Sequence, residues 1–414
     1  MARLRISRTF SGRFFQDGET MQYPFTEEQL ALAQLTKDFM EKEVAPAAVE
    51  LDRKHDPRDC YPGELIRKAS KLGLRTLAVP EAYGGIGADT ATKTLCLWTG
   101  AQIEIGTIKC LSQCWKVSNV LFKMGNEDQK QRWGKAFVED DDFVGAILMT
   151  EPDYGSDNLL RQPDPKLGLK MSAVKDGDHW VLNGAKRFNS LSPWARVLIV
   201  FVRTDPSKPV SQGSSVFLVP GDAEGLTHGQ VHDKLGYRLY PNGETFFDNV
   251  RIHERDMLGP LNGGYVTQAT IFRGSAELPA CNTGICRGLW SFCHQHAKDR
   301  VQGGKPIIEH PTVRHMLAEM LMNIEVAEQF MWRICWGVEN DASYNTRMTR
   351  YGKVFSDQVA MKTIYLATDI LAGIGIMKES PSEKMIRDLI TFLHGDGTDS
   401  LTLLRAAQTM DQPL

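Results

Sequence analysis

The residues of this chain best suited to chemistry lie near its C-terminus, in the stretch HGDGTDS at 394–400. Two carboxylates, Asp396 and Asp399, stand there beside Gly397 and Thr398, between two apolar runs of helical type. Asp-Gly is among the commonest turn dipeptides, so a surface turn is one interpretation. The other is a general base, a carboxylate that a glycine-containing loop holds against a substrate to take its proton.

Three blocks of different periodicity would position such a loop. Residues 26–145 carry apolar residues at helical spacing, and Thr26-Glu27-Glu28-Gln29 matches the capping box that begins a helix. Residues 146–260 change to short runs rich in Val, Phe and Ile, and the Asp-Gly pair inside LKMSAVKDGDHWVLNGAKRFNS predicts a β-hairpin. Residues 261–414 return to long apolar helical runs, as expected of a buried bundle or a subunit interface.

We therefore predict an α+β fold that is mostly α. It would consist of an N-terminal arm (residues 1–25), a helical domain (26–145), a central β domain (146–260) and a C-terminal helical bundle (261–414).

Composition limits the partners that this chain can have. It has 48 Lys plus Arg and 51 Asp plus Glu in 414 residues, and a net charge of −3 gives no reason to expect a nucleic acid partner. No stretch approaches 18 uninterrupted apolar residues, so a membrane span is not expected. The eight cysteines form no Cys-x-x-Cys pair. This favours buried apolar thiols in a reducing compartment, and no metal site is predicted.

The first fifteen residues, MARLRISRTFSGRFF, carry four arginines and no acid. This composition is typical of mitochondrial transit peptides. We interpret the segment as an N-terminal arm of a cytoplasmic protein, and the mitochondrial matrix remains the alternative.

Seven motifs follow one another along the chain. They are MTEPDYGSD (149–157), WVLNGAKRFNS (180–190), LGYRLYPNGETFFDNVRIHERDMLG (235–259), RVQGGKPIIEHPTVRHMLAEM (300–320), DILAGIGI (369–376), EKMIRDL (383–389) and GDGT (395–398). In this order they resemble the signatures of the acyl-CoA dehydrogenase family, from about residue 26 to about residue 407. Any one motif is weak, whereas seven in the right order are a strong resemblance.

The resemblance implies a flavoenzyme with a helical domain, a β domain and a C-terminal four-helix bundle, usually a homotetramer. FAD would lie between the β domain and the bundle, with its adenine end reaching a neighbouring subunit. An acyl-CoA would be the substrate and an electron-transfer flavoprotein the electron acceptor.

The resemblance also assigns roles to particular residues. The cofactor-binding residues it implies are Thr150, Ser156, Phe188, Ser190, Arg300, Gln302, Gly373 and Thr398. Three positions depart from the family's pattern: Asn189 replaces the usual Ile, Gly303 the usual Phe, and Asp369 the usual Gln. A carboxylate beside a pyrophosphate would be repelled, so we expect Asp369 to point away or to pair with a cation such as Arg300.

The family's common catalytic base is the Glu of Glu-Gly-Thr, and Asp396 stands at that position here. The interval of 27 residues from Asp369 matches the family's spacing. By this resemblance Asp396 removes the α-proton of an acyl thioester while the β-hydrogen leaves as hydride to the flavin. Some members place the base at the start of the bundle, where Glu277 is the weaker candidate here. Gly395, where many relatives carry an aromatic residue, would open volume beside the reacting carbons and favour a branched or ring-bearing acyl group.

Two other functions remain open from the sequence. A flavin oxidase of the nitroalkane-oxidase type resembles the same pattern and also uses an aspartate base, but it makes no use of CoA. A non-catalytic subunit that kept the fold and lost its flavin is the third hypothesis.

Overall fold

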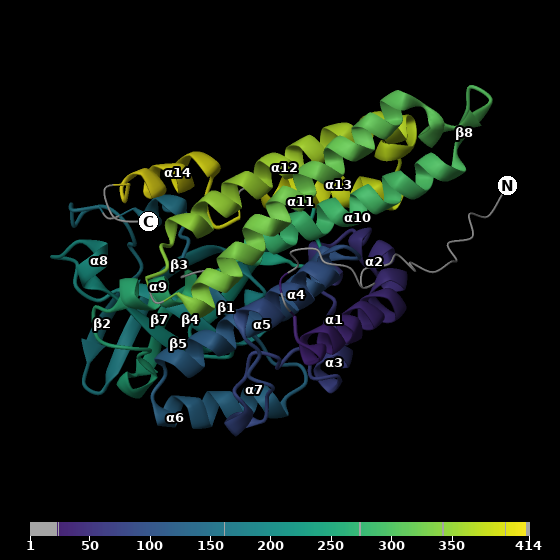
Figure 1. Ribbon diagram of the computed structural model, residues 1–414. Coiled ribbons are helices and arrows are strands. Elements are labelled where there is room, and N and C mark those ends of the chain that lie inside the picture. Colours follow the sequence, from purple (N-terminus) through teal and green to yellow (C-terminus); the bar gives the residue numbers. More distant parts are fainter. Residues whose placement is uncertain are drawn as a thin grey trace.

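The computed structural model describes residues 23, 25–160, 162–272, 275–341, 343–393 and 395–410. Helices, then a sheet, then long helices follow one another along the chain, which is the predicted α+β architecture (Figure 1). Of the predicted N-terminal arm only residues 23 and 25 are described. The arginine-rich stretch and the transit-peptide alternative therefore lie outside the described residues.

The first block consists of helices packed around a largely buried one. The helix α1 (Glu27–Phe39) begins at the predicted capping box, in which Thr26 Oγ1 accepts from the backbone N–H of Gln29 at 3.2 Å. The others are α2 (Ala45–Asp52), α3 (Gly63–Lys71), α4 (Thr90–Ala101), α5 (Ile105–Met124), α6 (Glu127–Gln129) and α7 (Lys135–Glu139). Most of α5 is buried, so polar side chains on it face the interior of the protein.

The second block forms one sheet. Its strands are β1 (Val144–Leu148), β2 (Ser172–Asp176), β3 (His179–Ser190), β4 (Ala195–Arg203), β5 (Ser214–Pro220), β6 (Leu226–Val231) and β7 (Asn242–His253). Their order is β1-β4-β2-β3-β7-β6, and β5 pairs with β4. The predicted hairpin is present: β2 and β3 are antiparallel with Asp176 opposite His179, and Gly177 has φ 62° in the turn. The short helix α8 (Val210–Gly213) precedes β5.

The sheet separates two hydrophobic cores. Alternate residues of β4 face opposite sides: Val197, Ile199 and Phe201 join the large core shared with the helices. Leu198, Val200 and Val202 join a smaller core on the other face. A strand that is buried on both faces of a sheet has apolar residues at consecutive positions. This explains why RVLIVFVR does not alternate between apolar and polar residues.

The third block is a bundle of long helices. The four that lie side by side are α10 (Glu277–Asp299), α11 (Pro311–Asn340), α12 (Arg347–Leu371) and α13 (Pro381–Phe392) (Figure 1). The helix α9 (Gly264–Phe272) precedes them, and α14 (Asp399–Ala407) packs on α12. A small hairpin of β8 (Val301–Gln302) and β9 (Lys305–Pro306) extends from the end of α10 that is remote from the sheet (Figure 1).

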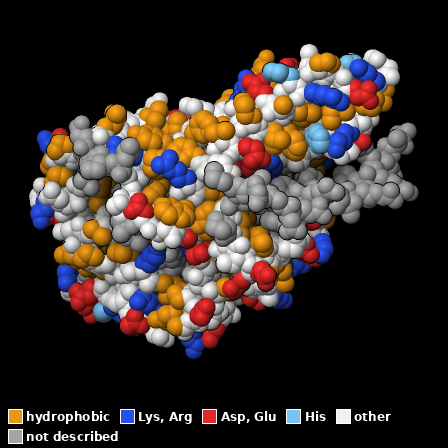
Figure 2. Space-filling view, viewed as in Figure 1, with side chains coloured by type: hydrophobic (Ala, Val, Ile, Leu, Met, Phe, Trp, Pro, Cys, Tyr) orange, Lys and Arg blue, Asp and Glu red, His pale blue; other side chains and the backbone are white. Residues whose placement is uncertain are grey.

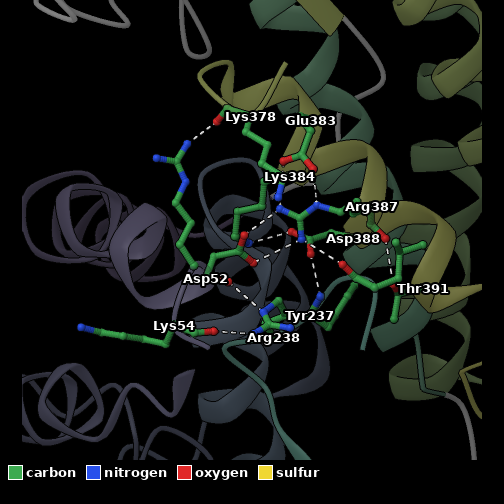
Figure 3. Close-up of polar contacts among 12 residues, drawn as sticks. Asp52, Lys54, Tyr237, Arg238, Lys378, Glu383, Lys384, Arg387, Asp388 and Thr391 are labelled. Atoms are coloured by element: carbon green, nitrogen blue, oxygen red, sulfur yellow. Dashed lines mark hydrogen bonds and ion pairs between the residues drawn. The ribbon is translucent and has the colours of Figure 1, made fainter. Parts of the chain in front are cut away.

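Ion pairs connect α13 to the first block, and a hydrogen bond connects it to the second. Lys384 Nζ lies 2.7 Å from Asp388 Oδ2 and 2.7 Å from Oε1 of Glu104, the residue before α5. Arg387 pairs with Asp52 of α2 at 2.6 Å, and Asp388 accepts from the backbone N–H of Tyr237 at 2.6 Å (Figure 3). Because removing one partner of a buried ion pair costs about 3–5 kcal/mol, this network fixes the helix that leads into the 395–398 loop.

One segment of the described chain, Arg347–Ile376, is long and apolar enough to cross a membrane, with mean hydropathy 1.5 over its most apolar window. Half of that window is buried inside the bundle, and core helices of soluble proteins pass the same test. All eight cysteines are free and buried, as the sequence predicted.

Candidate active site

A cavity of about 670 Å³ lies where the three blocks meet. Its walls come from α5, from β1 and the loop after it, from β3 and the 234–242 loop, and from α13 with the loop that follows it. Residues up to 289 positions apart in the chain therefore share one site, since Lys109 and Thr398 both line it.

Most of the residues singled out from the sequence line this cavity. They are Thr150, Ser156, Phe188, Ser190, Gly395, Asp396 and Thr398. Arg300, Gln302 and Gly373 do not line it. Arg300 and Gln302 lie at the hairpin on the remote end of the bundle, and Gly373 lies just after α12. Asp369 is exposed on α12, and among the described residues it forms no ion pair with Arg300.

The 395–398 loop is both a turn and part of the cavity wall. Asp396 has φ 54° and Gly397 has φ 113°, so the chain passes through the left-handed region, which Gly adopts freely and Asp tolerates better than most residues. Thr398 then caps α14, and its side chain accepts from the backbone N–H of Leu401 at 3.4 Å. The reversal directs Asp396 into the cavity wall rather than along a helix.

A single buried lysine holds both ends of this loop. Lys353 Nζ of α12 donates to the carbonyl of Leu393 at 3.1 Å and to Asp399 Oδ1 at 2.6 Å. Its third partner is Asp357 Oδ2, also at 2.6 Å. The contact with Asp357 is an ion pair, and the other oxygen of Asp357 accepts a hydrogen bond from the Asn282 amide. Burial, together with the neighbouring Asp399, raises the pKa of Asp357 to about 8 against the opposing effect of Lys353.

Glu277, the other candidate base, is engaged elsewhere. It is the first residue of α10 and is buried, and its carboxylate is shared by Lys109, Ser112 and Lys116. Burial alone would raise the pKa of Glu277, but the two ammonium groups outweigh it and hold that pKa far below its usual range. A carboxylate with so low a pKa is a poor proton acceptor.

The β-sheet wall offers a ring and hydroxyl groups to the cavity. Phe188 has φ 57° and is 56 % exposed, and the centroid of its ring lies 4.6 Å from that of the His232 ring. Ser190 Oγ accepts from Asn242 at 2.8 Å. Asn189, the departure from the family's Ile, is buried and donates to Thr245 Oγ1 at 3.3 Å, which gives its amide a partner inside the sheet.

These residues suit a flat aromatic cofactor with polar edges. A large apolar ring that is half exposed and faces a cavity gains from being covered by such a group. The hydroxyl groups of Thr150, Ser156, Ser190 and Thr398 line the same space and could bind its polar atoms. The cavity thus fits the reacting end of FAD.

Several cavity residues were not singled out from the sequence. They are Lys109, Gln113, Lys116, Lys234 and Tyr240. A signal for three of them is present, because Lys109, Gln113 and Lys116 stand at helical spacing, on one side of the run 105–124. Lys234 and Tyr240 belong to an irregular loop, where no periodicity marks the inward side.

Comparison with known proteins agrees with a flavin-dependent dehydrogenase. Residues 26–141, 146–250 and 262–410 match the N-terminal, middle and C-terminal domains of the acyl-CoA dehydrogenase family. The chain is 30 % identical to the probable acyl-CoA dehydrogenase YngJ of Bacillus subtilis over 94 % of this chain and 100 % of that one. It is also 30 % identical to the cyclohex-1-ene-1-carbonyl-CoA dehydrogenase of Geobacter metallireducens, over 91 % of this chain and 96 % of the relative.

A solved structure shows the same fold. The butyryl-CoA dehydrogenase of Megasphaera elsdenii superposes with a TM-score of 0.86 at 28 % identity, over 94 % of this chain and 100 % of that one. The protein belongs to the acyl-CoA dehydrogenase family, whose members are FAD-dependent oxidoreductases that dehydrogenate acyl-CoA.

Proposed function

We propose that this protein converts an acyl-CoA thioester to the α,β-unsaturated enoyl-CoA and that Asp396 is the base that takes the α-proton. The observation that supports this most directly is the position of Asp396 in the wall of the cavity that Thr150, Phe188 and Ser190 also line. FAD, when bound there, supplies the acceptor for the β-hydride.

The residues around Asp396 limit the position of its carboxylate for the proton transfer. The α-proton of a thioester is a weak acid, so it needs a carboxylate held within hydrogen-bond reach and at a fixed angle. Lys353 holds the loop at both ends, which limits the positions that the carboxylate can take. Asp is one methylene shorter than the family's usual Glu, so the substrate's α-carbon has to approach the loop about 1.5 Å more closely.

Gly395 favours a broad acyl group. A Cβ at this position would stand 3.2 Å from the Phe392 carbonyl and 3.4 Å from its ring, so a side chain here would project beside the Phe392 wall of the cavity. Without a side chain at Gly395 the cavity is wider next to the reacting carbons, which suits a branched or alicyclic acyl group. The relative named cyclohex-1-ene-1-carbonyl-CoA dehydrogenase supports the alicyclic option.

We further propose that the active form is a homotetramer in which Arg300, Gln302 and Gly373 serve a neighbour's FAD. Among the described residues of one chain, nothing lies within 4 Å of where a Cβ of Gly373 would stand, so no described contact requires glycine there. A pyrophosphate that approaches the backbone from another subunit would require it. Arg300 suits the same pyrophosphate through paired N–H donors.

The remaining parts of the proposal follow the family pattern. An electron-transfer flavoprotein would take the electrons, and the cytoplasm would be the location, with the mitochondrial matrix as the alternative. The domains would span 26–145, 146–260 and 261–414, after an arm at 1–25. The relatives described above do not favour a nitroalkane oxidase.

Anaerobic mixing of the FAD-loaded protein with a panel of straight, branched and alicyclic acyl-CoAs tests the reaction. We expect the flavin absorbance to bleach, and mass spectrometry to find a product two hydrogens lighter than the substrate. A flavin that bleaches with nitroalkanes and with no thioester would contradict the proposal.

A further inference from the structure

Three polar side chains of α5 form one wall of the cavity. Lys109, Gln113 and Lys116 are four and three residues apart, so they share a face of the helix, and all three line the cavity. The side chains of Lys109 and Lys116 are only 4 % and 16 % exposed. We call these three residues the α5 donor face.

The acceptor atoms beside the α5 donor face already have partners. Glu277 Oε1 accepts from Lys109 Nζ and Ser112 Oγ, and Glu277 Oε2 lies 2.6 Å from Lys116 Nζ. Gln113 Oε1 accepts from the Tyr240 hydroxyl at 3.0 Å. A molecule that entered this part of the cavity would therefore find few free acceptors for its own donors.

Donors remain in excess. An ammonium group carries three N–H bonds and an amide two. Among the described residues Glu277 takes one bond from each lysine, and no partner takes the Gln113 amide N–H bonds. Although burial opposes it, the Glu277 carboxylate raises the pKa of both Lys109 and Lys116, so both stay protonated. The Asp396 carboxylate adds to the effect of Glu277 on both pKa values, so the excess at this wall is one of N–H donors rather than of charge.

The other charged groups at the cavity do not take up these free N–H bonds. Asp396 lines the cavity but forms no ion pair with Lys109 or Lys116 within 4.0 Å in the described structure. Lys234 donates to the Tyr240 carbonyl at 2.7 Å and to the Asn242 side chain, so its ammonium is bound to the 234–242 loop.

A hydrocarbon tail suits this wall poorly. Packed against the α5 donor face, it would leave buried ammonium N–H bonds without partners, which is strongly unfavourable. A carboxylate brings two oxygens with about four acceptor positions, which match the free N–H bonds, and hydrogen bonds between ionised groups are the stronger ones.

We propose that the acyl group of the substrate ends in a carboxylate, which Lys109, Gln113 and Lys116 bind; this rests on the proposed function. The branched or alicyclic width beside Gly395 concerns the reacting carbons, whereas the carboxylate concerns the end of the acyl group, so one substrate can have both features. The terminal carboxylate is unchanged in the reaction: the α-proton goes to Asp396, the β-hydride goes to FAD, and the Cα–Cβ bond becomes double.

A pair of thioesters of similar shape tests this inference. Glutaryl-CoA ends in a carboxylate, and 5-methylhexanoyl-CoA carries an isopropyl group at the same place. We expect the kcat/KM of the FAD-loaded protein for glutaryl-CoA to exceed that for 5-methylhexanoyl-CoA by on the order of 10²-fold or more. A site that hydrogen-bonds its substrate rejects an analogue that cannot form those hydrogen bonds.

Variants assign that preference to the α5 donor face. Lys116→Met and Lys109→Met should each reduce the preference at least tenfold, and Lys116→Gln, which keeps a polar group, should reduce it less. Lys123→Met is the matched control, because Lys123 is exposed on the same helix outside the cavity, and it should leave the preference intact.

The outcomes separate this inference from the proposed function. The carboxylate inference is wrong if 5-methylhexanoyl-CoA reduces the flavin as well as glutaryl-CoA does. It is also wrong if Lys116→Met leaves the preference unchanged in a folded, FAD-loaded protein. In both cases the dehydrogenase proposal stands. If no thioester reduces the flavin, both are wrong.

Discussion

At the scale of single residues, the HGDGTDS stretch shows why a motif can support two interpretations at once. Thr398 caps a helix and Asp396 occupies a left-handed turn, as the turn interpretation requires. Both residues nevertheless line the cavity. The sequence could indicate a loop with a carboxylate, but only the fold brings that carboxylate to Thr150 and Phe188, which are more than 200 residues away.

Lys234 provides a residue-scale prediction about pH. Burial lowers the pKa of Lys234 to about 7, whereas in an unfolded chain a lysine has a pKa of about 10.4. Between these values the unfolded chain holds the proton and the folded protein does not. The free energy of unfolding should therefore rise with pH from this group, by up to about 1.4 kcal/mol per pH unit.

Lys234→Met should remove that contribution. Urea unfolding at pH 7, 8 and 9 measures it, with Lys123→Met as an exposed-lysine control. The wild type and the control should gain stability relative to Lys234→Met as the pH rises. Parallel profiles for all three proteins would show that the Lys234 ammonium keeps an ordinary pKa.

The α5 donor face marks the limit of what the sequence revealed about single residues. The sequence shows lysines at helical spacing within 105–124. It does not distinguish a buried lysine from a solvated one. Only the fold shows that Glu277 of α10 pairs with both lysines and leaves some of their N–H bonds free.

At the scale of elements, the position of Asp396 depends on α12. Lys353 binds the end of α13 through Leu393 and the start of α14 through Asp399, so one side chain sets the span of the loop between them. Lys353→Met should destabilise the protein by about 1–3 kcal/mol, because the Leu393 carbonyl and the Asp399 carboxylate would lose their donor. It should also slow flavin reduction by on the order of 10²-fold through misplacement of Asp396.

Two further variants separate a positioning role from a merely structural one. Lys353→Arg should restore part of the rate of flavin reduction per bound FAD, and Asp399→Asn, at a partly exposed residue, should lower kcat more than it raises KM. Lys362→Met on the same helix is the control, since Lys362 is more exposed and pairs with Glu319. Loss of melting temperature in Lys353→Met without loss of rate would contradict the positioning role.

The sequence predicts which segments are helices and strands better than it predicts the detailed geometry of those elements. The capping box at Thr26 and the Asp176-Gly177 hairpin are local signals, and the structure confirms both. The π-helical turn at Met40–Val44 is not a local signal of this kind. The helical run continues through this turn and Pro46 to Asp52, although proline usually ends a helix.

At the scale of the whole molecule, the bundle presents apolar side chains to its surroundings. Hydrophobic side chains are spread over the bundle helices in Figure 2. The exposed large apolar residues of α11, α12 and the turn after it include Met322, Val326, Met361, Tyr365 and Ile376. Surfaces of this kind mark contacts with other protein chains. The sequence predicts a buried bundle or a subunit interface. It does not show which apolar residues pack inside the bundle and which contact another chain.

This surface and the remote hairpin lead to a prediction about assembly. Arg300→Ala should lower FAD affinity by on the order of tenfold, because it removes a phosphate contact, and it should leave the oligomer intact. Tyr365→Asp, which places a charge on the exposed face of α12, should weaken both the oligomer and FAD binding. Sedimentation velocity with detection at flavin wavelengths measures size and cofactor together. A flavin-saturated monomer would contradict the shared cofactor site.

The central claim is that Asp396 is the base of an acyl-CoA dehydrogenation, and stopped-flow flavin reduction of Asp396→Asn tests it most directly. Asn keeps nearly the same size, so FAD content and thioester binding should stay at wild-type levels. The rate of flavin reduction should fall by on the order of 10²-fold or more, the usual contribution of a positioned base. Glu277→Gln, which alters the other candidate carboxylate, should reduce its flavin much faster than Asp396→Asn does. If Asp396→Asn reduces its flavin at the wild-type rate while Glu277→Gln does not, the base is Glu277 and the 395–398 loop is only a turn.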